Sequence, residues 1–161
     1  MIFREARPDE IPELLAEAYP VWQRGRTFAQ YCADNRKEEA YGTRYVLEKD
    51  GEVVSSLIWL WPECRLPRKV FGIGSVVTPP RFRGHGYASE MLMHCLRMAD
   101  LSTDIVLLYS DVDPAFYERF AFRALPAALQ SKADSVFMAL CDEAGWIELL
   151  SSPIEALPEY F

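Results

Sequence analysis

The sequence lacks paired cysteines and has few histidines. Its four cysteines, Cys32, Cys64, Cys95 and Cys141, are widely spaced with no Cys-x-x-Cys pair, and only two histidines are present in 161 residues. Because zinc and iron–sulfur sites need clustered thiolate or imidazole ligands, we expect no metal. The cysteines are most simply free thiols of a reducing compartment.

Long apolar runs and an excess of basic charge are also missing. No apolar run approaches about 18 residues, the length that a spanning helix needs, and no leader-like pattern opens the sequence. The formal net charge is −7. This balance disfavours a nucleic-acid surface, because phosphate backbones are held mainly by lysine and arginine. We therefore expect a cytoplasmic protein that binds neither nucleic acid nor membrane.

The most informative segment that is present runs from Ser75 to Leu92. It passes from a β-branched strand through a basic turn into an amphipathic helix. The first turn of a helix carries unpaired N–H donors and the positive end of the helix dipole, and both favour phosphate. Gly84 and Gly86 can adopt positive φ and admit a ligand, while Arg83 adds a cation. The segment predicts an anion-binding turn.

The spacing of this turn separates it from other phosphate-binding loops. A Walker loop needs lysine and then serine or threonine after its last glycine, whereas Tyr87 and Ala88 follow Gly86 here. A dinucleotide fingerprint needs three glycines, and this turn has two. The remaining pattern, Arg/Gln-x-x-Gly-x-Gly/Ala, begins at Arg83 and resembles the acetyl-CoA pyrophosphate loop of the GNAT acyltransferase superfamily.

A second block supports this resemblance. Residues 105–110 read as a buried strand, and Asp113 and Pro114 begin a short helix. The block is similar to the strand, helix and Tyr-x-x-x-Gly-Phe sequence of GNAT proteins, with Tyr117 at their frequent general acid. Ser110 stands where relatives often carry asparagine. Ala121 replaces their glycine, at a cost of roughly 1 kcal/mol if the position demands positive φ.

The resemblance implies an α+β GNAT fold with a mixed central sheet of about seven strands, splayed between strands 4 and 5 and flanked by helices. Residue patterns predict strands at 2–6, 44–49, 52–61, 69–78, 104–109, 123–126 and 135–140, and helices at 11–20, 27–39, 87–99 and 114–119, the first ended by Pro20. The dipeptide Asp50-Gly51 predicts a hairpin.

We expect a GNAT domain over residues 1–141. Residues 142–161 form an apolar extension that packs on the domain or on a partner chain, which would allow a homodimer.

Acetyl-CoA is the co-substrate that the resemblance implies. Main-chain groups of the fourth strand would bind its pantetheine arm as an added strand. The full set of implied cofactor contacts is Ser75, Val76, Val77, Arg81, Arg83, Gly84, His85, Gly86, Tyr87, Ala88, Ser89, Ser110 and Phe116.

Acyl transfer to an amine also needs an oxyanion donor, a proton for the thiolate and a base. By the resemblance, a backbone N–H near Val77 would meet the oxyanion, and Tyr117 would protonate sulfur, although an aromatic core role is the alternative. The base stays open between Glu63, Asp111 and water. Asp111 is the strongest single candidate, yet a turn or capping role fits it better.

In this fold the acceptor site would be lined by Trp22, Tyr31, Tyr41, Trp59, Trp61 and residues 129–134. Such aromatic residues suit a cationic or apolar acceptor, so a small-molecule amine or amino acid is favoured over a peptide amine. The run from 108 to 117 also resembles a fungal lysine N-acetyltransferase subgroup. Three functions remain open: an N-acetyltransferase, a non-catalytic acyl-CoA-binding module, and an interaction protein on a GNAT scaffold.

Overall fold

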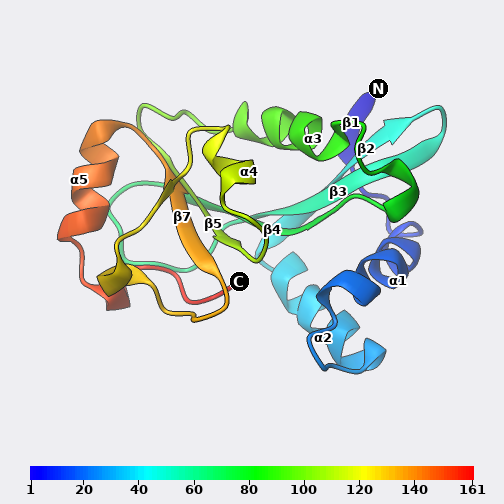
Figure 1. Ribbon diagram of the computed structural model, residues 1–161, viewed down its shortest axis with the longest axis horizontal. Coiled ribbons are helices and arrows are strands. Elements are labelled where there is room, and N and C mark those ends of the chain that lie inside the picture. Colours follow the sequence, from blue (N-terminus) through cyan, green and yellow to red (C-terminus); the bar gives the residue numbers. More distant parts are fainter. The chain divides into compact units, whose positions relative to one another are not determined.

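A computed structural model describes residues 1–161 and contains a seven-stranded mixed sheet with flanking helices (Figure 1). The strand order is β1-β2-β3-β4-β5-β7-β6. The strands are β1 (Ile2–Glu5), β2 (Gly42–Lys49), β3 (Glu52–Leu60), β4 (Val70–Val77), β5 (Ile105–Ser110), β6 (Arg123–Ala124) and β7 (Val136–Leu140). The predicted α+β class and the mixed sheet are confirmed.

The helices are α1 (Ile11–Trp22), α2 (Phe28–Glu39), α3 (Tyr87–Leu96), α4 (Ala115–Glu118) and α5 (Glu143–Ser151), with short 3-10 turns at Pro80–Phe82, Ala127–Leu129 and Ile154–Ala156. No helix is both long enough and apolar enough to cross a membrane. The chain forms two compact units. Unit 1 comprises Met1–Leu60 and Ser75–Arg97, and unit 2 comprises Trp61–Gly74 and Met98–Phe161.

Unit 1 is built on the antiparallel strands β1, β2 and β3. The β2–β3 turn has Asp50 at φ 53° and Gly51 at φ 83°, as the dipeptide predicts for a primed hairpin turn. Helices α1 and α2 lie on one side of β3 and α3 lies on the other (Figure 1). Buried residues of α1, α2 and β4 form one core cluster, made of Leu15, Ala18, Tyr31 and Val77.

Unit 2 holds the parallel pair of β4 and β5. Their ladder runs from Val70 opposite Ile105 to Ile73 opposite Leu108, and it stops there although both strands continue. Strand β7 pairs antiparallel with β5 on its other side, and β6 follows. The core cluster of this unit combines β5 and β7 with Leu149 of α5.

The structure corrects three sequence predictions about helices. Pro20 lies inside α1, which continues to Trp22. Proline removes only its own N–H from the helix, and the Gln23 N–H still bonds to the Tyr19 carbonyl at 2.8 Å. Helix α3 ends at Leu96, earlier than expected. Helix α5 was missed, although Asp142 caps it by accepting the Gly145 N–H at 2.7 Å.

Candidate functional site

The turn before α3 has the geometry of an anion site. Gly84 and Gly86 have φ of 79° and 82°, and Gly86 is the N-cap of the helix. The first backbone hydrogen bond of α3 runs from the Glu90 N–H to the Gly86 carbonyl at 3.0 Å. The N–H groups of residues 84–89 precede it and have no acceptor in the protein. A phosphate group could therefore accept several N–H bonds at the positive end of the helix dipole.

Side chains around this turn leave it open. No atom lies within 4 Å of a Cβ built on Gly84 or Gly86. The His85 ring stacks on the ring of Tyr87, with centroids 5.7 Å apart and planes 12° apart. Arg83 is exposed and its Nε donates to the Thr78 carbonyl at 3.1 Å, which holds a cation beside the free amides.

Other predicted cofactor residues of unit 1 contribute in different ways. Tyr87 is nearly buried and its hydroxyl accepts a hydrogen bond from Lys49 at 3.1 Å. Ala88 and Ser89 are half-buried in the first turn of α3. The Arg81 guanidinium pairs with Glu17, so its charge is already matched within the protein.

The end of β4 carries Ser75, Val76 and Val77. Ser75 has φ of 48°, in the left-handed region that non-glycine residues avoid. Such strain is frequent at ligand sites. The Val77 carbonyl accepts a hydrogen bond from Ser55 at 3.1 Å, while Ser75 and Val76 are half-buried.

In unit 2, Tyr117 of α4 is buried with 7% of its surface exposed. Its ring makes edge contacts with Phe116 and Phe122, at centroid distances of 5.0 and 6.1 Å. Burial, with a smaller effect from the charge of Asp111, raises the pKa of Tyr117 to about 12. The phenol therefore stays protonated at neutral pH, as a proton donor must.

Ser110 and Asp111 follow β5 and are engaged within unit 2. The buried Ser110 hydroxyl donates to the Val112 carbonyl at 2.8 Å. The Asp111 carboxylate accepts hydrogen bonds from Ser135 and, at 3.4 Å, from Tyr160. Both partners of Asp111 lie far from it in the sequence, so its contacts join β5 to the segment before β7 and to the C-terminal segment.

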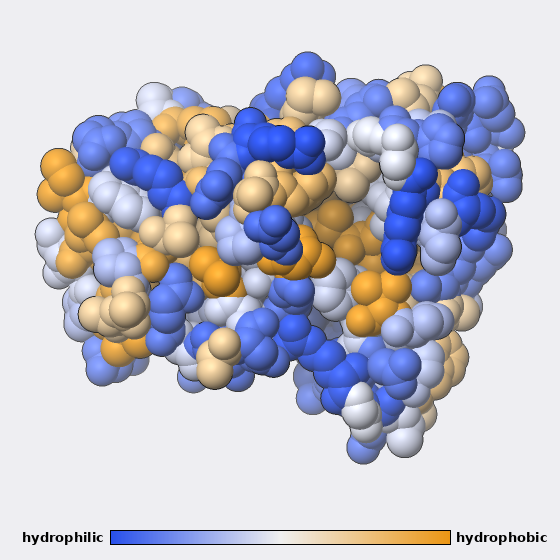
Figure 2. Space-filling model, in the orientation of Figure 1, coloured by the Kyte–Doolittle hydropathy of each residue, from blue (hydrophilic) through white to orange (hydrophobic).

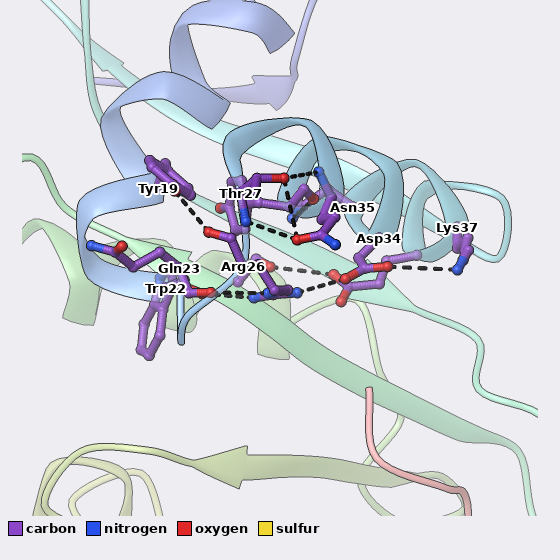
Figure 3. A network of polar contacts seen from close by, with 12 residues as sticks. Tyr19, Trp22, Gln23, Arg26, Thr27, Asp34, Asn35 and Lys37 are labelled. Carbon is purple, nitrogen blue, oxygen red and sulfur yellow. Dashed lines mark hydrogen bonds and ion pairs between the residues drawn. The ribbon is translucent and has the colours of Figure 1, made fainter.

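The turn between α1 and α2 is fixed by one arginine (Figure 3). Arg26 donates to Asp34 at 2.9 Å, to the Trp22 carbonyl at 2.6 Å and to the Gln23 carbonyl at 3.1 Å. The Tyr19 hydroxyl donates to the Arg26 carbonyl at 2.7 Å. The turn that follows Trp22, a residue predicted to line the acceptor site, is therefore held by several hydrogen bonds.

Residues 3–125 match the family model described as an acetyltransferase (GNAT) domain. The chain belongs to the GNAT acetyltransferase family. The matched segment contains the anion turn, β4, β5 and Tyr117. A comparison with curated proteins finds no match.

Solved GNAT structures share the fold. An acetyltransferase from Corynebacterium glutamicum, described as histone acetyltransferase HPA2 and related acetyltransferase, superposes with a TM-score of 0.67 and 18% identity over 86% of this chain and 94% of that chain. Rv2747 from Mycobacterium tuberculosis, solved with CoA, superposes with a TM-score of 0.64 and 15% identity over 88% of this chain and 99% of that chain. YhbS from Escherichia coli, also solved with CoA, superposes with a TM-score of 0.63 and 18% identity over 86% of this chain and 79% of that chain. At these identities the likeness shows the fold alone.

The predicted aromatic lining separates into buried and exposed residues. Tyr31 and Trp59 are core side chains, with 1% and 2% exposed, whereas Tyr41 and Trp61 are open to solvent. In unit 2, a cavity of about 570 Å³ has walls from β5, β7, the predicted 129–134 segment and the C-terminal segment. Its lining is Tyr109, Leu129, Ser131, Lys132, Phe137, Ile154, Glu155, Leu157, Pro158, Glu159 and Tyr160.

Sequence reasoning missed one acidic residue that meets β4. Glu38 of α2 accepts a hydrogen bond from the Ser75 hydroxyl at 3.3 Å. A signal was available in the helical spacing, because Tyr31, Asn35 and Glu38 are separated by four and then three residues and so share one face of α2. Tyr31 and Asn35 are the buried residues of that helix, which places Glu38 on its inner face.

Proposed function

We propose that this protein transfers an acetyl group from acetyl-CoA to a primary amine. The observation that carries the proposal is the row of acceptor-free N–H groups at residues 84–89, with two left-handed glycines and Arg83 beside them. A diphosphate is the anion that such a row fits best. Membership of the GNAT family supports CoA as its source.

The other predicted residues take roles along the same cofactor. In this proposal, the main chain at Ser75, Val76 and Val77 binds the pantetheine arm, and an N–H near Val77 meets the oxyanion. Tyr117 gives its proton to the departing thiolate. Its raised pKa, about 12, keeps the phenol protonated, so that it can donate a hydrogen bond to the developing thiolate as the C–S bond breaks.

The acceptor is proposed to be a small-molecule amine or amino acid. Aromatic side chains that were expected to line its site, Trp22 and Tyr41 among them, suit a cationic or apolar acceptor.

Thiol release from acetyl-CoA with a panel of amines tests the proposal. Tyr117→Phe should lower kcat by about 100-fold or more, because a positioned proton donor contributes on that order, and should leave acetyl-CoA affinity unchanged. Tyr45→Phe is the matched control, since Tyr45 lies on β2 and stacks on Phe3 outside the proposed site. Equal turnover by the Tyr117 variant would assign the proton to another group.

A non-catalytic acyl-CoA-binding module is the second candidate. It is favoured by the hydrogen bonds of Ser110 and Asp111, because the candidate base Asp111 is already held by contacts within unit 2. Acetyl-CoA would then raise the melting temperature of a protein that turns over no amine. The third candidate, an interaction protein on a GNAT scaffold, requires that acetyl-CoA cause no such shift.

A further inference from the structure

Glu38 lies at the end of α2 and brings a carboxyl group to β4. Its Oε2 atom accepts the Ser75 hydroxyl at 3.3 Å. Ser75 is the residue of β4 with left-handed backbone geometry, at φ 48°. The contact joins a half-buried acid to the point at which β4 leaves regular strand geometry, within the segment proposed to bind pantetheine.

The cations near Glu38 are already paired with other acids. Arg44 forms an ion pair with Glu39 at 2.9 Å, and Arg26 forms one with Asp34 at 2.9 Å. Glu38 has a hydroxyl as its partner and no ion pair of its own. A carboxylate withdrawn from water without a cation is unfavourable unless a ligand supplies the positive charge.

Two phenols lie near enough to this acid to be affected by its charge. The Tyr31 side chain is 1% exposed and belongs to the core. Tyr41 is 37% exposed, and burial and the charge of Glu38 both raise its pKa. The Tyr41 ring is therefore the one that a ligand at Glu38 could reach.

Burial also raises the pKa of Glu38 above its ordinary value. The Ser75 hydrogen bond and the charges of Arg44 and Arg26 act in the opposite direction, while Asp34 adds to the increase. The acid is thereby shifted toward the pH range in which it can take up a proton and release it again, as a base in catalysis must.

We propose that Glu38 binds the primary ammonium group of the acceptor and removes its proton, with the Ser75 hydroxyl as its polar neighbour. The inference rests on the proposed acetyl transfer and narrows its acceptor to a cationic alkylamine. The exposed phenol ring of Tyr41 suits such a cation through cation–π attraction.

The proton balance is complete. The ammonium loses one proton to the Glu38 carboxylate, which becomes a carboxylic acid, and the neutral nitrogen attacks the thioester carbonyl carbon. A C–N bond forms and the C–S bond breaks. The sulfur takes the Tyr117 proton, and the second nitrogen proton returns to the tyrosinate through solvent. Glu38 then releases its proton to water.

The test compares Glu38→Gln with wild type, using phenethylamine and cadaverine as acceptors and 2-phenylethanol as an uncharged probe. Glutamine keeps an acceptor for Ser75 and removes the charge. We expect kcat/KM for both amines to fall by about 100- to 1,000-fold, the usual range for loss of a positioned base. Glu38→Asp should recover part of the loss. Glu13→Gln makes the same charge change at an exposed position of α1 and should stay within about twofold of wild type.

The pH profile separates chemistry from structure. Wild-type kcat/KM should fall as pH decreases through the raised pKa of Glu38, because protonation removes the base. Glu38→Gln should lack this step and respond only to the pKa of the free amine. A merely structural Glu38 would leave the profile unchanged in shape, and that result would overturn the inference.

Thermal shifts keep this inference distinct from the proposed function. Phenethylamine should raise the melting temperature of wild type and not of Glu38→Gln, and 2-phenylethanol should raise neither. An equal shift in both proteins, or none in wild type, would contradict ammonium binding at Glu38. If phenethylamine raised the melting temperature of wild type but was not acetylated, the proposed acetyl transfer would be wrong and ammonium binding at Glu38 would stand. The acetyl-CoA shift, expected to be equal in all variants, verifies that they are folded.

Discussion

Ala121 holds a backbone conformation that suits glycine. Its φ is 66°, and it follows α4 at the position where a left-handed residue ends a helix. The Phe122 N–H bonds to the Tyr117 carbonyl at 3.4 Å, and the Ala121 N–H bonds to the Glu118 carbonyl at 2.9 Å. This pair of bonds is the Schellman motif, and it directs the Phe122 ring onto Tyr117.

Ala121→Gly should therefore stabilise the protein by about 1 kcal/mol, because glycine adopts this φ without the clash of a Cβ. Urea unfolding of wild type and variant measures the difference. Ala124→Gly is the control, since Ala124 lies in β6 with ordinary backbone geometry and should lose about 0.5–1 kcal/mol. If both substitutions lowered the free energy of unfolding, the left-handed conformation of Ala121 would not be costing the protein stability.

The carboxylate of Glu10 is held by an arginine of β1. Arg4 donates two hydrogen bonds to its carboxylate, at 2.7 and 2.8 Å, and also bonds to Glu48 at 2.6 Å. These bonds, with the Arg7 N–H, lower the pKa of Glu10 to about 2. A lowered pKa adds stability above the ordinary value of the unfolded chain, and that stability is lost as pH falls toward 2.

Glu10→Gln should therefore cost about 1–2 kcal/mol at pH 7, and the difference from wild type should shrink between pH 4.5 and pH 2. Guanidinium unfolding at several pH values gives the two curves. Glu13→Gln removes a charge from the exposed side of the same helix and should change stability by less than about 0.5 kcal/mol at each pH. Parallel curves for wild type and Glu10→Gln would contradict the assigned role of Arg4.

A glycine with positive φ occurs both at the start of α3 and in the β2–β3 hairpin. Gly86 and Gly51 have φ of 82° and 83°, and at neither residue does any atom lie within 4 Å of the position that a Cβ would take. Only the segment that contains Gly86 also has a row of acceptor-free amides. The two glycines therefore form a matched pair for separating strain from ligand binding.

Gly86→Ala and Gly51→Ala should each destabilise the protein by about 1 kcal/mol, because alanine is strained at positive φ. Gly86→Ala alone should weaken acetyl-CoA binding, by about tenfold or more, since its methyl group projects into the space where the phosphate must approach. Calorimetric titration with acetyl-CoA measures affinity, and urea unfolding measures stability. Equal acetyl-CoA affinity in the two variants would remove the anion turn from the proposed site.

Elements with a local cause were predictable from the sequence. The hairpin at Asp50-Gly51 and the turn before α3 depend on which residues tolerate positive φ, and both were found. Helix α5 begins at Asp142, a standard N-cap, yet its apolar residues point both outward and inward, so periodicity did not reveal it. Pro20 was given too much weight, because proline disrupts a helix less when little helix follows it.

The candidate site was predictable in part for the same reason. The turn at residues 84–89 is contiguous in sequence, so its chemistry can be read locally. Glu38 meets Ser75 through the packing of α2 against β4, a contact between residues 37 positions apart. The contact of Asp111 with Ser135, 24 positions further along the chain, depends on tertiary packing in the same way.

At the scale of the whole molecule, the proposed activity draws on both units. Unit 1 contains the anion turn and Glu38, and unit 2 contains Tyr117 and the cavity. Strand β4 belongs to both, since Val70–Gly74 lie in unit 2 and Ser75–Val77 lie in unit 1.

The C-terminal segment, residues 142–161, lies beyond the family match, which ends at residue 125, and its two faces differ. Leu149 and Leu157 are buried in the unit 2 cluster with Tyr109 and Phe137. Ile147 is 60% exposed, and hydrophobic residues line the outer edge at α5 (Figure 2). We propose that the segment is a structural part of unit 2, which encloses the cavity and completes its core.

Leu149→Ala and Leu157→Ala should each destabilise the protein by about 2–4 kcal/mol, because each leaves a cavity in a packed cluster. Ile147→Ala deletes a similar side chain from the exposed face of the same helix and should cost less than about 0.5 kcal/mol. Urea unfolding supplies the three values, and sedimentation of each variant reports the oligomeric state. If the segment instead served to cover a partner chain, Ile147→Ala would dissociate an oligomer, and the Leu157 variant would retain the stability of wild type.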